Sequence, residues 1–292
     1  MSQQSKSKIF RLGFKTNDWK SKYTETSNED RSLHLHQEMQ IKEFLFAIFK
    51  TKDIFIYDFH ISRSYNKINV VITYFQIVSN TVNNQPFRIQ LENFLHSCSG
   101  NEIVDSKLEN ELSTNNLERK FPITSVLKIL KIFLGNSCNI SLTFLNVKKS
   151  FFFKELFKKK LLQIIYQLRR YKKKKFFFQT LMVLLITYQK KNSAELLAKW
   201  ISLQLSKMKI HNQFLSFLNV MLLLLLNSYF SNIKGIKILI KGRLNNKPRK
   251  RTKIIHSGKI SLQTFDTVIN QSQNTAYTKN GTLGVKVWIC TS

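Results

Sequence analysis

The most constraining feature of this sequence is the uneven distribution of its charge. Up to residue 118 the chain holds 14 acidic residues and 14 Lys or Arg residues, whereas residues 119–292 hold 33 Lys or Arg residues and only three acids, Glu155, Glu195 and Asp266. A polycation of this kind attracts phosphate polymers through counterion release, and an anionic membrane surface is the next alternative. The charge therefore favours nucleic acid as the partner of the C-terminal three-fifths.

Length and composition narrow the possibilities further. A chain of 292 residues is long enough for two or three domains. Lys, Asn, Ile, Phe and Leu dominate while Gly (8) and Pro (3) are scarce, as expected for a gene in a very A+T-rich organellar genome. The N-terminus has neither an apolar run nor an Arg-rich amphipathic stretch, so no cleaved targeting peptide is expected.

Residues that usually carry catalysis or bind metals are too dispersed to form a site. Cys98, Cys138 and Cys290 show no C-x-x-C spacing and no paired His, so neither a zinc site nor a disulfide framework is predicted, and a reducing compartment fits. The His residues show no metal-ligand spacing, and the acids of the basic part are too few for acid–base or two-metal chemistry. No enzymatic activity, metal or cofactor is expected.

The N-terminal half shows the apolar periodicities of a mixed helix and strand domain. Apolar side chains recur at helical spacing in two segments, and β-branched and aromatic residues with partial alternation mark three strands. The predicted elements are a helix over residues 33–50, strands over 54–61 and 67–75, a polar stretch over 78–116, a helix over 123–134 and a strand over 139–147.

The C-terminal half begins with a Lys-rich, Phe-rich segment of low complexity, residues 148–191, which is interpreted as an insertion. Ser193 is the candidate N-cap of the helix that follows. Polar Asn, Ser, Gln and Lys stretches between the later apolar runs are predicted as turns. The predicted elements are helices over 193–204 and 212–228 and strands over 236–240, 252–262 and 282–289.

Several short blocks near the C-terminus match one known family in residues and in spacing. The segment over residues 234–289 resembles the C-terminal domain of the small-subunit ribosomal protein three family. Residues 194–205 resemble the helix that opens the same domain, and residues 10–13 and 18–21 resemble the start of that family's chain. The matching blocks are Lys234-Gly235-Ile236-Lys237, Lys241-Gly242-Arg243-Leu244, Arg251-Thr252, Gly258-Lys259 with Leu262 and Thr264, and Gly284-Val285-Lys286-Val287-Trp288-Ile289.

The resemblance implies an α+β fold in which a type II KH domain, in the order α, β, β, α, α, β, precedes the ribosomal C-terminal domain. A working KH loop needs Gly-x-x-Gly so that the backbone can approach a phosphate, and residues 73–90 contain no glycine, so this KH domain is expected to be degenerate. The expected domains are an N-terminal extension (1–32), a degenerate KH-like domain (33–147), a basic low-complexity insertion (148–191) and a C-terminal rRNA-binding domain (192–292).

Two further departures from the family pattern refine this expectation. The family carries an Arg/Lys cluster that faces incoming mRNA, but the aligned positions here are Asn212, Gln213 and Ser216, so assistance in opening mRNA structure is not expected. The insertion at residues 148–191 resembles the expansions that mitochondrial members carry at the same junction. A mitochondrion is therefore favoured over a plastid.

The resemblance implies a structural constituent of the small ribosomal subunit in organellar translation. Such a protein would lie in the head near the mRNA entry site and bind small-subunit rRNA, mRNA and neighbouring ribosomal proteins. Phosphate contacts by cations would position it without reading sequence. The residues expected to contact RNA are Arg11, Lys15, Lys20, Lys207, Lys209, Lys241, Arg243, Lys247, Arg249, Lys250, Arg251, Lys253 and Lys259.

Two alternatives from other classes stay open at this point. An intron-maturase-like RNA-binding protein has a similar composition but needs a cluster of metal-binding acids. A membrane-associated basic protein would use residues 176–188 and 214–230, although a buried helix is favoured there and a membrane partner is not expected. The basic tracts over residues 148–175 fit contact with rRNA or a protein, disorder, or a membrane surface.

Overall fold

The computed structural model describes two compact units. One unit is formed by Trp19–Phe153, and the other by Met1–Asp18 together with Lys154–Ser292; we call them the N-terminal unit and the C-terminal unit. The structure describes residues 7, 9–11, 20–25, 27, 29–52, 54–64, 67–76, 123–135, 138–147, 155–189, 193–227, 233–245, 248 and 252–291, without the side chains of residues 155–158.

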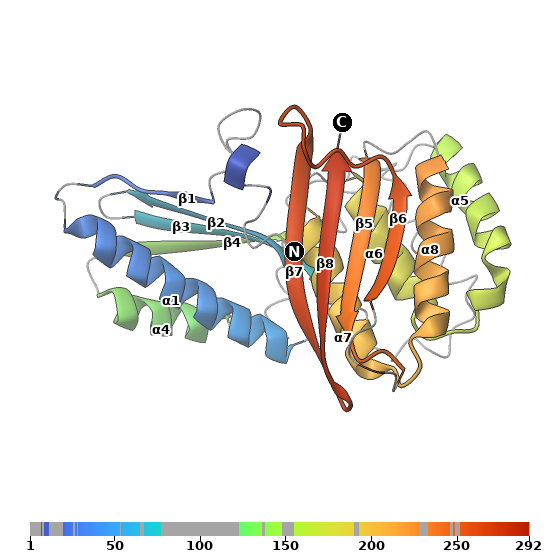
Figure 1. Ribbon diagram of the computed structural model, residues 1–292. Helices are drawn as coiled ribbons and strands as arrows, with labels where there is room; N and C mark the ends of the chain where they lie inside the picture. The colour runs from blue at the N-terminus through green and yellow to red at the C-terminus, as the bar shows by residue number, and fades with distance from the viewer. Residues whose placement is uncertain are drawn as a thin grey trace. The chain divides into compact units, whose positions relative to one another are not determined.

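The N-terminal unit is a four-stranded sheet with two helices on one face (Figure 1). The strand order is β1-β2-β3-β4, in which β2 and β3 are antiparallel and β3 and β4 are parallel. Leu45, Phe49 and Ile72 are almost fully buried in the core between sheet and helices. Its elements are β1 (Ser21–Lys22), α1 (Asp30–Thr51), β2 (Ile54–Ser64), β3 (Lys67–Gln76), α4 (Ile123–Leu134) and β4 (Asn139–Asn146).

These elements confirm the helices and strands that were predicted for this half of the chain. The described order, helix, strand, strand, helix, strand, is compatible with the order implied for a type II KH domain. A second consecutive helix is not present among the described residues, and most of the glycine-free stretch lies within residues 77–122, outside them. The KH assignment and the degenerate loop therefore stay predictions.

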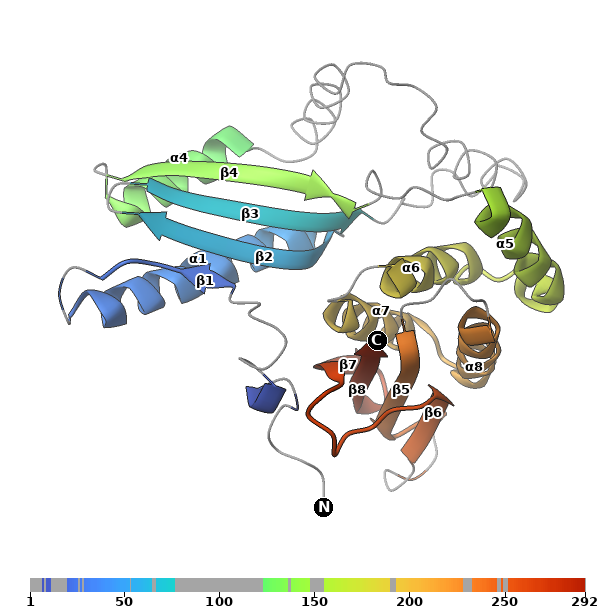
Figure 2. The same ribbon diagram turned by 90° about the horizontal axis from the view of Figure 1, so that it is seen from above.

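The C-terminal unit is a four-stranded antiparallel sheet covered by helices on one face (Figure 2). The strand order is β6-β5-β8-β7; α7 packs on β7 and β8, and α8 packs on β6 and β5. A short N-terminal turn, η1 (Ile9–Arg11), belongs to the same unit. The other elements are α5 (Glu155–Gln167), η4 (Arg169–Tyr171), α6 (Phe177–Gln189), α7 (Ala194–Lys207), α8 (Asn212–Asn227), β5 (Ile233–Gly242), β6 (Thr252–Gly258), β7 (Val268–Thr278) and β8 (Gly281–Thr291).

Helix α6 forms part of the core of this unit, although it lies within the segment that was interpreted as an insertion. Ten of its residues are buried, Leu184 completely, and α6 packs against α7. Trp200 donates its indole N–H to the Thr180 hydroxyl at 3.2 Å, and the Tyr188 hydroxyl donates to the Leu222 carbonyl at 3.2 Å. Burial of the Tyr188 phenol raises its pKa. The structure thus places α6 in the core of the C-terminal unit, and the expected domain boundaries at 148 and 191 stay predictions.

Two other expectations are corrected. Strand β7 was predicted as a turn because its sequence, VINQSQNTAYT, is mostly polar, but it pairs with β8 over its whole length. Ser193 precedes α7 without capping it through its side chain; its hydroxyl donates instead to the Thr187 carbonyl in α6 at 3.0 Å. Among the described residues, no helix is both long enough and apolar enough to cross a membrane.

Candidate nucleic-acid interface

Two turns at one end of the C-terminal unit are bonded to each other through Asn245. This residue follows β5 and adopts φ of +50°, a left-handed conformation that Asn tolerates better than most side chains. Its side-chain oxygen accepts a hydrogen bond from the His211 backbone N–H at 2.7 Å, and its amide group donates to the Asn212 side chain. The β5–β6 turn is therefore fixed against the α7–α8 connection.

The α7–α8 connection is itself held by a buried histidine. His211 is 2 % exposed, and its Nε2 lies 3.2 Å from the Leu205 carbonyl and 3.1 Å from the Met208 carbonyl. These contacts hold the chain between Met208 and Asn212 close to the end of α7. Lys209 on this short connection consequently has a defined position relative to the sheet.

This arrangement brings together five of the cations that the sequence predicted as RNA contacts. Lys241 and Lys253 lie on adjacent strands at this end of the sheet, with their side chains on opposite faces, because Lys241 pairs with Thr252 and Lys253 pairs with Ile240. None of the five side chains is buried. We call this group the basic end; its members are Lys207, Lys209, Lys241, Arg243 and Lys253.

The face of the sheet away from the helices carries lysines beyond the predicted residues, beside Trp288 and Cys290, which are buried there against Ile260 and Leu262. Along β5 the even-numbered Ile236, Ile238 and Ile240 are completely buried under the helices, so the odd-numbered Lys237 and Lys241 face the opposite side. Lys286 on β8 pairs with Leu239 and lies on that side too. Lys237 and Lys286 were not among the predicted contacts, because their position depends on strand alternation across β5 and β8.

Three predicted contacts lie elsewhere. Arg11 is only 6 % exposed, and its guanidinium donates to the carbonyls of Ser7, Leu262 and Thr264 at 2.7–2.9 Å, which argues against an RNA contact. Lys20 belongs to the N-terminal unit and forms an ion pair with Asp58 at 3.0 Å. Lys259 follows the last residue of β6, whereas the basic end lies near Thr252, its first residue. An extended strand of this length separates the two positions by about 20 Å. The other predicted contacts lie outside the described residues; they are Lys15, Lys247, Arg249, Lys250 and Arg251.

The Lys20–Asp58 pair contributes to the stability of the N-terminal unit. Burial of the Asp58 carboxyl pushes its pKa up, but the charge and hydrogen bond of Lys20, the charge of His60 and the hydrogen bond of the Phe59 N–H outweigh burial. The pKa of Asp58 is therefore held below its usual value. The pair fixes the residue before β1 against the buried strand β2.

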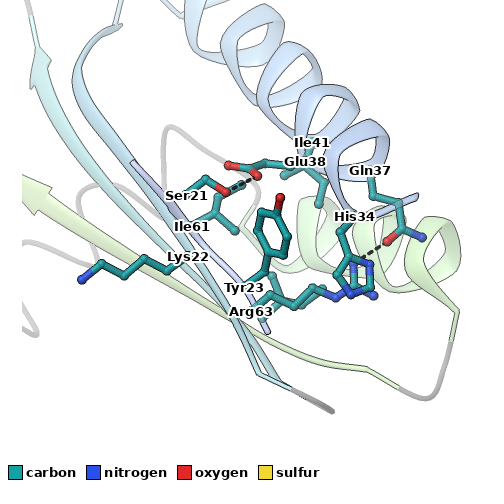
Figure 3. A pocket seen from close by; sticks show the side chains of 10 residues that line it. Ser21, Lys22, Tyr23, His34, Gln37, Glu38, Ile41, Ile61 and Arg63 are labelled. Carbon is teal, nitrogen blue, oxygen red and sulfur yellow. Dashed lines mark hydrogen bonds between the residues drawn. The ribbon is translucent and has the colours of Figure 1, made fainter. Parts of the chain in front are cut away.

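A small pocket of the N-terminal unit lies between α1, β1 and β2 (Figure 3). The Tyr23 and His34 rings meet edge-on with their centroids 6.0 Å apart. Ser21 donates to the Glu38 carboxylate, and Arg63 donates to the Gln37 side chain. Because these two side-chain bonds join β1 and β2 to α1, the pocket is best explained as the contact that holds the strands against the helix. Among the described residues, no group of three or more His, Cys, Asp or Glu side chains could hold a metal ion.

Comparison with known proteins finds a match over the part of the chain that carries four of the five cations of the basic end. A family model described as "Ribosomal protein S3, C-terminal domain" matches residues 209–289, which run from the α7–α8 connection into β8. Residues 209–289 are therefore similar to the C-terminal domain of ribosomal protein S3. Within the matched region lie Lys209, Lys241, Arg243 and Lys253, whereas α5, α6 and α7 lie before it.

Individual S3 proteins are similar to part of the chain. Small ribosomal subunit protein uS3c of Cyanidium caldarium is 46% identical over 59 residues, which are 20% of this chain and 28% of the relative. Small ribosomal subunit protein uS3 of Microcystis aeruginosa is 38% identical over 96 residues, 33% of this chain and 37% of the relative. That of Phocaeicola vulgatus is 42% identical over 64 residues, 22% of this chain and 26% of the relative. The alignments therefore span less than two-fifths of each relative.

Two glycines of the S3-like blocks have a structural reason. Gly235 and Gly258 face each other across β5 and β6. A Cβ at Gly258 would lie 2.2 Å from the Lys234 carbonyl oxygen, and Gly258 also has φ of +78°. A Cβ at Gly235 would lie 2.5 Å from the Lys259 carbonyl oxygen. These glycines permit the close strand contact where β6 ends, so this part of the resemblance reflects the fold of the sheet.

Proposed function

We propose that this protein is a structural constituent of the small subunit of an organellar ribosome and that its C-terminal unit binds small-subunit rRNA. The observation that carries the proposal is the basic end, which lies largely within the S3-like region and is built from two turns that Asn245 bonds together. The relatives named small ribosomal subunit protein support a ribosomal role.

The proposed mechanism is charge neutralisation combined with fit to the RNA shape. Exposed Lys and Arg side chains neutralise phosphates and release counterions, which gives affinity without reading bases. Lys237 and Lys286, half-buried on the face of the sheet away from the helices, add positive charge beside the basic end. Because Asn245 fixes the two turns, fewer degrees of freedom are lost when the RNA binds.

The location within the ribosome is part of the proposal. A place in the head of the small subunit, near the mRNA entry site and in contact with neighbouring ribosomal proteins, follows from the family resemblance. Asn212 and Gln213 stand where the family carries cations, and Asn212 instead accepts a hydrogen bond from Asn245. We therefore propose rRNA anchoring without assistance in opening mRNA structure.

We propose a mitochondrion as the compartment. Two expected features support this proposal: the degenerate KH loop and the basic segment that precedes the S3-like region. A plastid is the alternative within the same proposal, since uS3c proteins of Cyanidium caldarium and Chlamydomonas moewusii are among the similar chains. Localisation of a tagged chain in the source cells separates the two compartments.

Removal of the basic end tests the proposal. Replacing Lys207, Lys209, Lys241 and Arg243 with Gln should lower incorporation of the chain into small subunits, measured as the fraction that sediments with small-subunit rRNA. The matched control replaces four exposed cations of the N-terminal unit with Gln; they are Lys42, Lys50, Lys128 and Lys131. Equal incorporation of the two variants would show that the basic end does not anchor the protein.

A further inference from the structure

A second cationic surface lies outside the S3-like region, between α5 and α6. Six of the seven residues over 169–175 are Lys or Arg, and all six are exposed. No acidic residue occurs in the sequence between Glu155 and Glu195 to offset this charge. We call these cations the basic corner; its members are Arg169, Arg170, Lys172, Lys173, Lys174 and Lys175.

The backbone of the basic corner is folded into consecutive turns. Tyr171 N–H donates to the Leu168 carbonyl at 2.9 Å, Lys174 N–H to the Tyr171 carbonyl at 2.9 Å, and Phe177 N–H to the Lys174 carbonyl at 3.0 Å. The short helix η4 occupies the first of these turns. The cations are thus presented from an ordered piece of chain, which lowers the entropy lost when they bind a ligand.

Apolar side chains on both sides fasten the corner to the rest of the C-terminal unit. Leu168 before it and Phe177 after it are almost completely buried, and Phe176 is 7 % exposed. The Tyr171 ring lies edge-on to the Phe217 ring of α8, with centroids 5.3 Å apart, and the Phe176 and Phe177 rings each lie 5.5 Å from that of Phe217. The corner is therefore rigidly attached to the helix that begins beside the basic end.

The direction of the apolar residues favours RNA over a membrane as the partner. A membrane-surface segment needs aromatic and aliphatic side chains free to enter the lipid beside its cations. Here Phe176 and Phe177 point into the protein core, and the ten buried residues of α6 do the same. An exposed aromatic ring beside the corner, Tyr166, has the Arg169 guanidinium 5.8 Å from its centroid, and both groups can stack on or bond to a nucleotide.

We propose that the basic corner binds the phosphate backbone of double-stranded RNA, independently of the basic end. This inference extends the proposed function to a part of the chain that the S3 family match does not cover, and it rests on that function only in naming RNA as the polyanion. Six fixed cations without a matching set of polar base-reading groups give contact with backbone and shape, so the binding is expected to be insensitive to sequence.

Salt-dependent binding to a defined duplex tests the inference with the full chain. The probe is a fluorescent RNA duplex of about 20 base pairs, somewhat longer than the span of a typical double-strand-binding domain. The corner variant replaces all six cations of the basic corner with Gln. We expect its affinity to fall about ten-fold or more and the salt slope to shrink by roughly 1 for each phosphate that the variant no longer neutralises.

A control with the same loss of charge separates a specific surface from net charge. It replaces six exposed cations of the N-terminal unit with Gln; they are Lys42, Lys50, Lys52, Lys67, Lys128 and Lys131. This control should keep an affinity within about two-fold of wild type. A third variant, with Arg at positions 172–175, keeps the charge and should bind like wild type. Equal weakening of the corner variant and the control would overturn the proposal.

Two further measurements complete the test. Thermal unfolding of the corner variant should match wild type, because its replaced side chains are exposed. Vesicles containing phosphatidylserine form the second arm: if the substitutions abolish vesicle binding and leave duplex binding intact, the corner is a membrane contact and the proposal is refuted. Duplex binding through the corner without sedimentation with small subunits would contradict the proposed function alone.

Discussion

Replacing Leu184 with Ala should strongly destabilise the C-terminal unit. Leu184 is completely buried in α6, within the Lys-rich and Phe-rich segment that the sequence pattern interprets as an insertion. A buried Leu to Ala change removes transfer free energy and leaves a cavity, so we expect a loss of about 2–5 kcal/mol in the free energy of unfolding. That is a large part of the total stability of a typical domain, about 5–15 kcal/mol.

The matched control is Leu162→Ala in the neighbouring helix α5. Leu162 is 49 % exposed, so the same change of side chain should cost less than about 1 kcal/mol there. Urea unfolding followed by tryptophan fluorescence reports on the C-terminal unit, because Trp200 is completely buried in it and Trp288 is 8 % exposed. If both variants unfold at the same urea concentration as wild type, α6 does not belong to the core.

Three further predictions concern other contacts. Asn245→Ala should lose about 1–3 kcal/mol of stability, because two hydrogen bonds are lost and Ala is strained in the left-handed backbone conformation. Asn245→Gly should lose less, because Gly adopts that conformation without strain. Thermal melts of the two variants measure the difference. Asp58→Asn should destabilise the N-terminal unit at neutral pH, because it removes the carboxylate that pairs with Lys20. The pKa of Asp58 is lowered in the folded state, so the wild type should lose its greater stability only as the pH falls below about 4, through that folded pKa. Thermal melts of both proteins across pH can follow this loss. Replacing the four cations of the β5–β6 turn with Ala should weaken assembly of the protein into the small subunit; these cations are Lys247, Arg249, Lys250 and Arg251. Unchanged co-sedimentation of this variant with the subunit would count against their role.

The helices and most strands could be predicted from the sequence because their burial follows simple periodicities. Helix α4 has the predicted bounds, residues 123–134, and the β2–β3 hairpin lies where alternating β-branched residues placed it. The strand β5 also matches, since its Ile residues at alternate positions are all buried against the helices. In each case local pattern and tertiary burial agree.

Strand β7 and helix α6 could not be placed correctly for opposite reasons. Strand β7 is polar, yet it is held at the sheet edge by pairing with β8 and by the Asn274 amide, which donates to the Ser202 hydroxyl of α7 at 2.8 Å. Helix α6 is strongly apolar, but the Lys tracts around it suggested low complexity. Both placements depend on partners distant in sequence, which periodicity does not report.

The candidate site was predicted in part. The cations of the basic end were recognisable as a cluster in the sequence, but their assembly depends on the bonds of Asn245, which no local pattern indicates. Arg11 was assigned to RNA because of its charge, whereas its guanidinium bonds to backbone carbonyls of the segment after β6. Charge alone therefore does not separate cations that bind a partner from those that fasten the chain to itself.

Sedimentation of the protein in a lysate of the proposed organelle tests the ribosomal assignment most directly. A sucrose gradient, probed for this chain and for small-subunit rRNA, should show both in the same fractions. Treatment with ribonuclease should release the chain toward the top of the gradient, because its binding depends on RNA phosphates. Sedimentation apart from the rRNA, or co-flotation with membranes that survives ribonuclease, would contradict a role in the small ribosomal subunit.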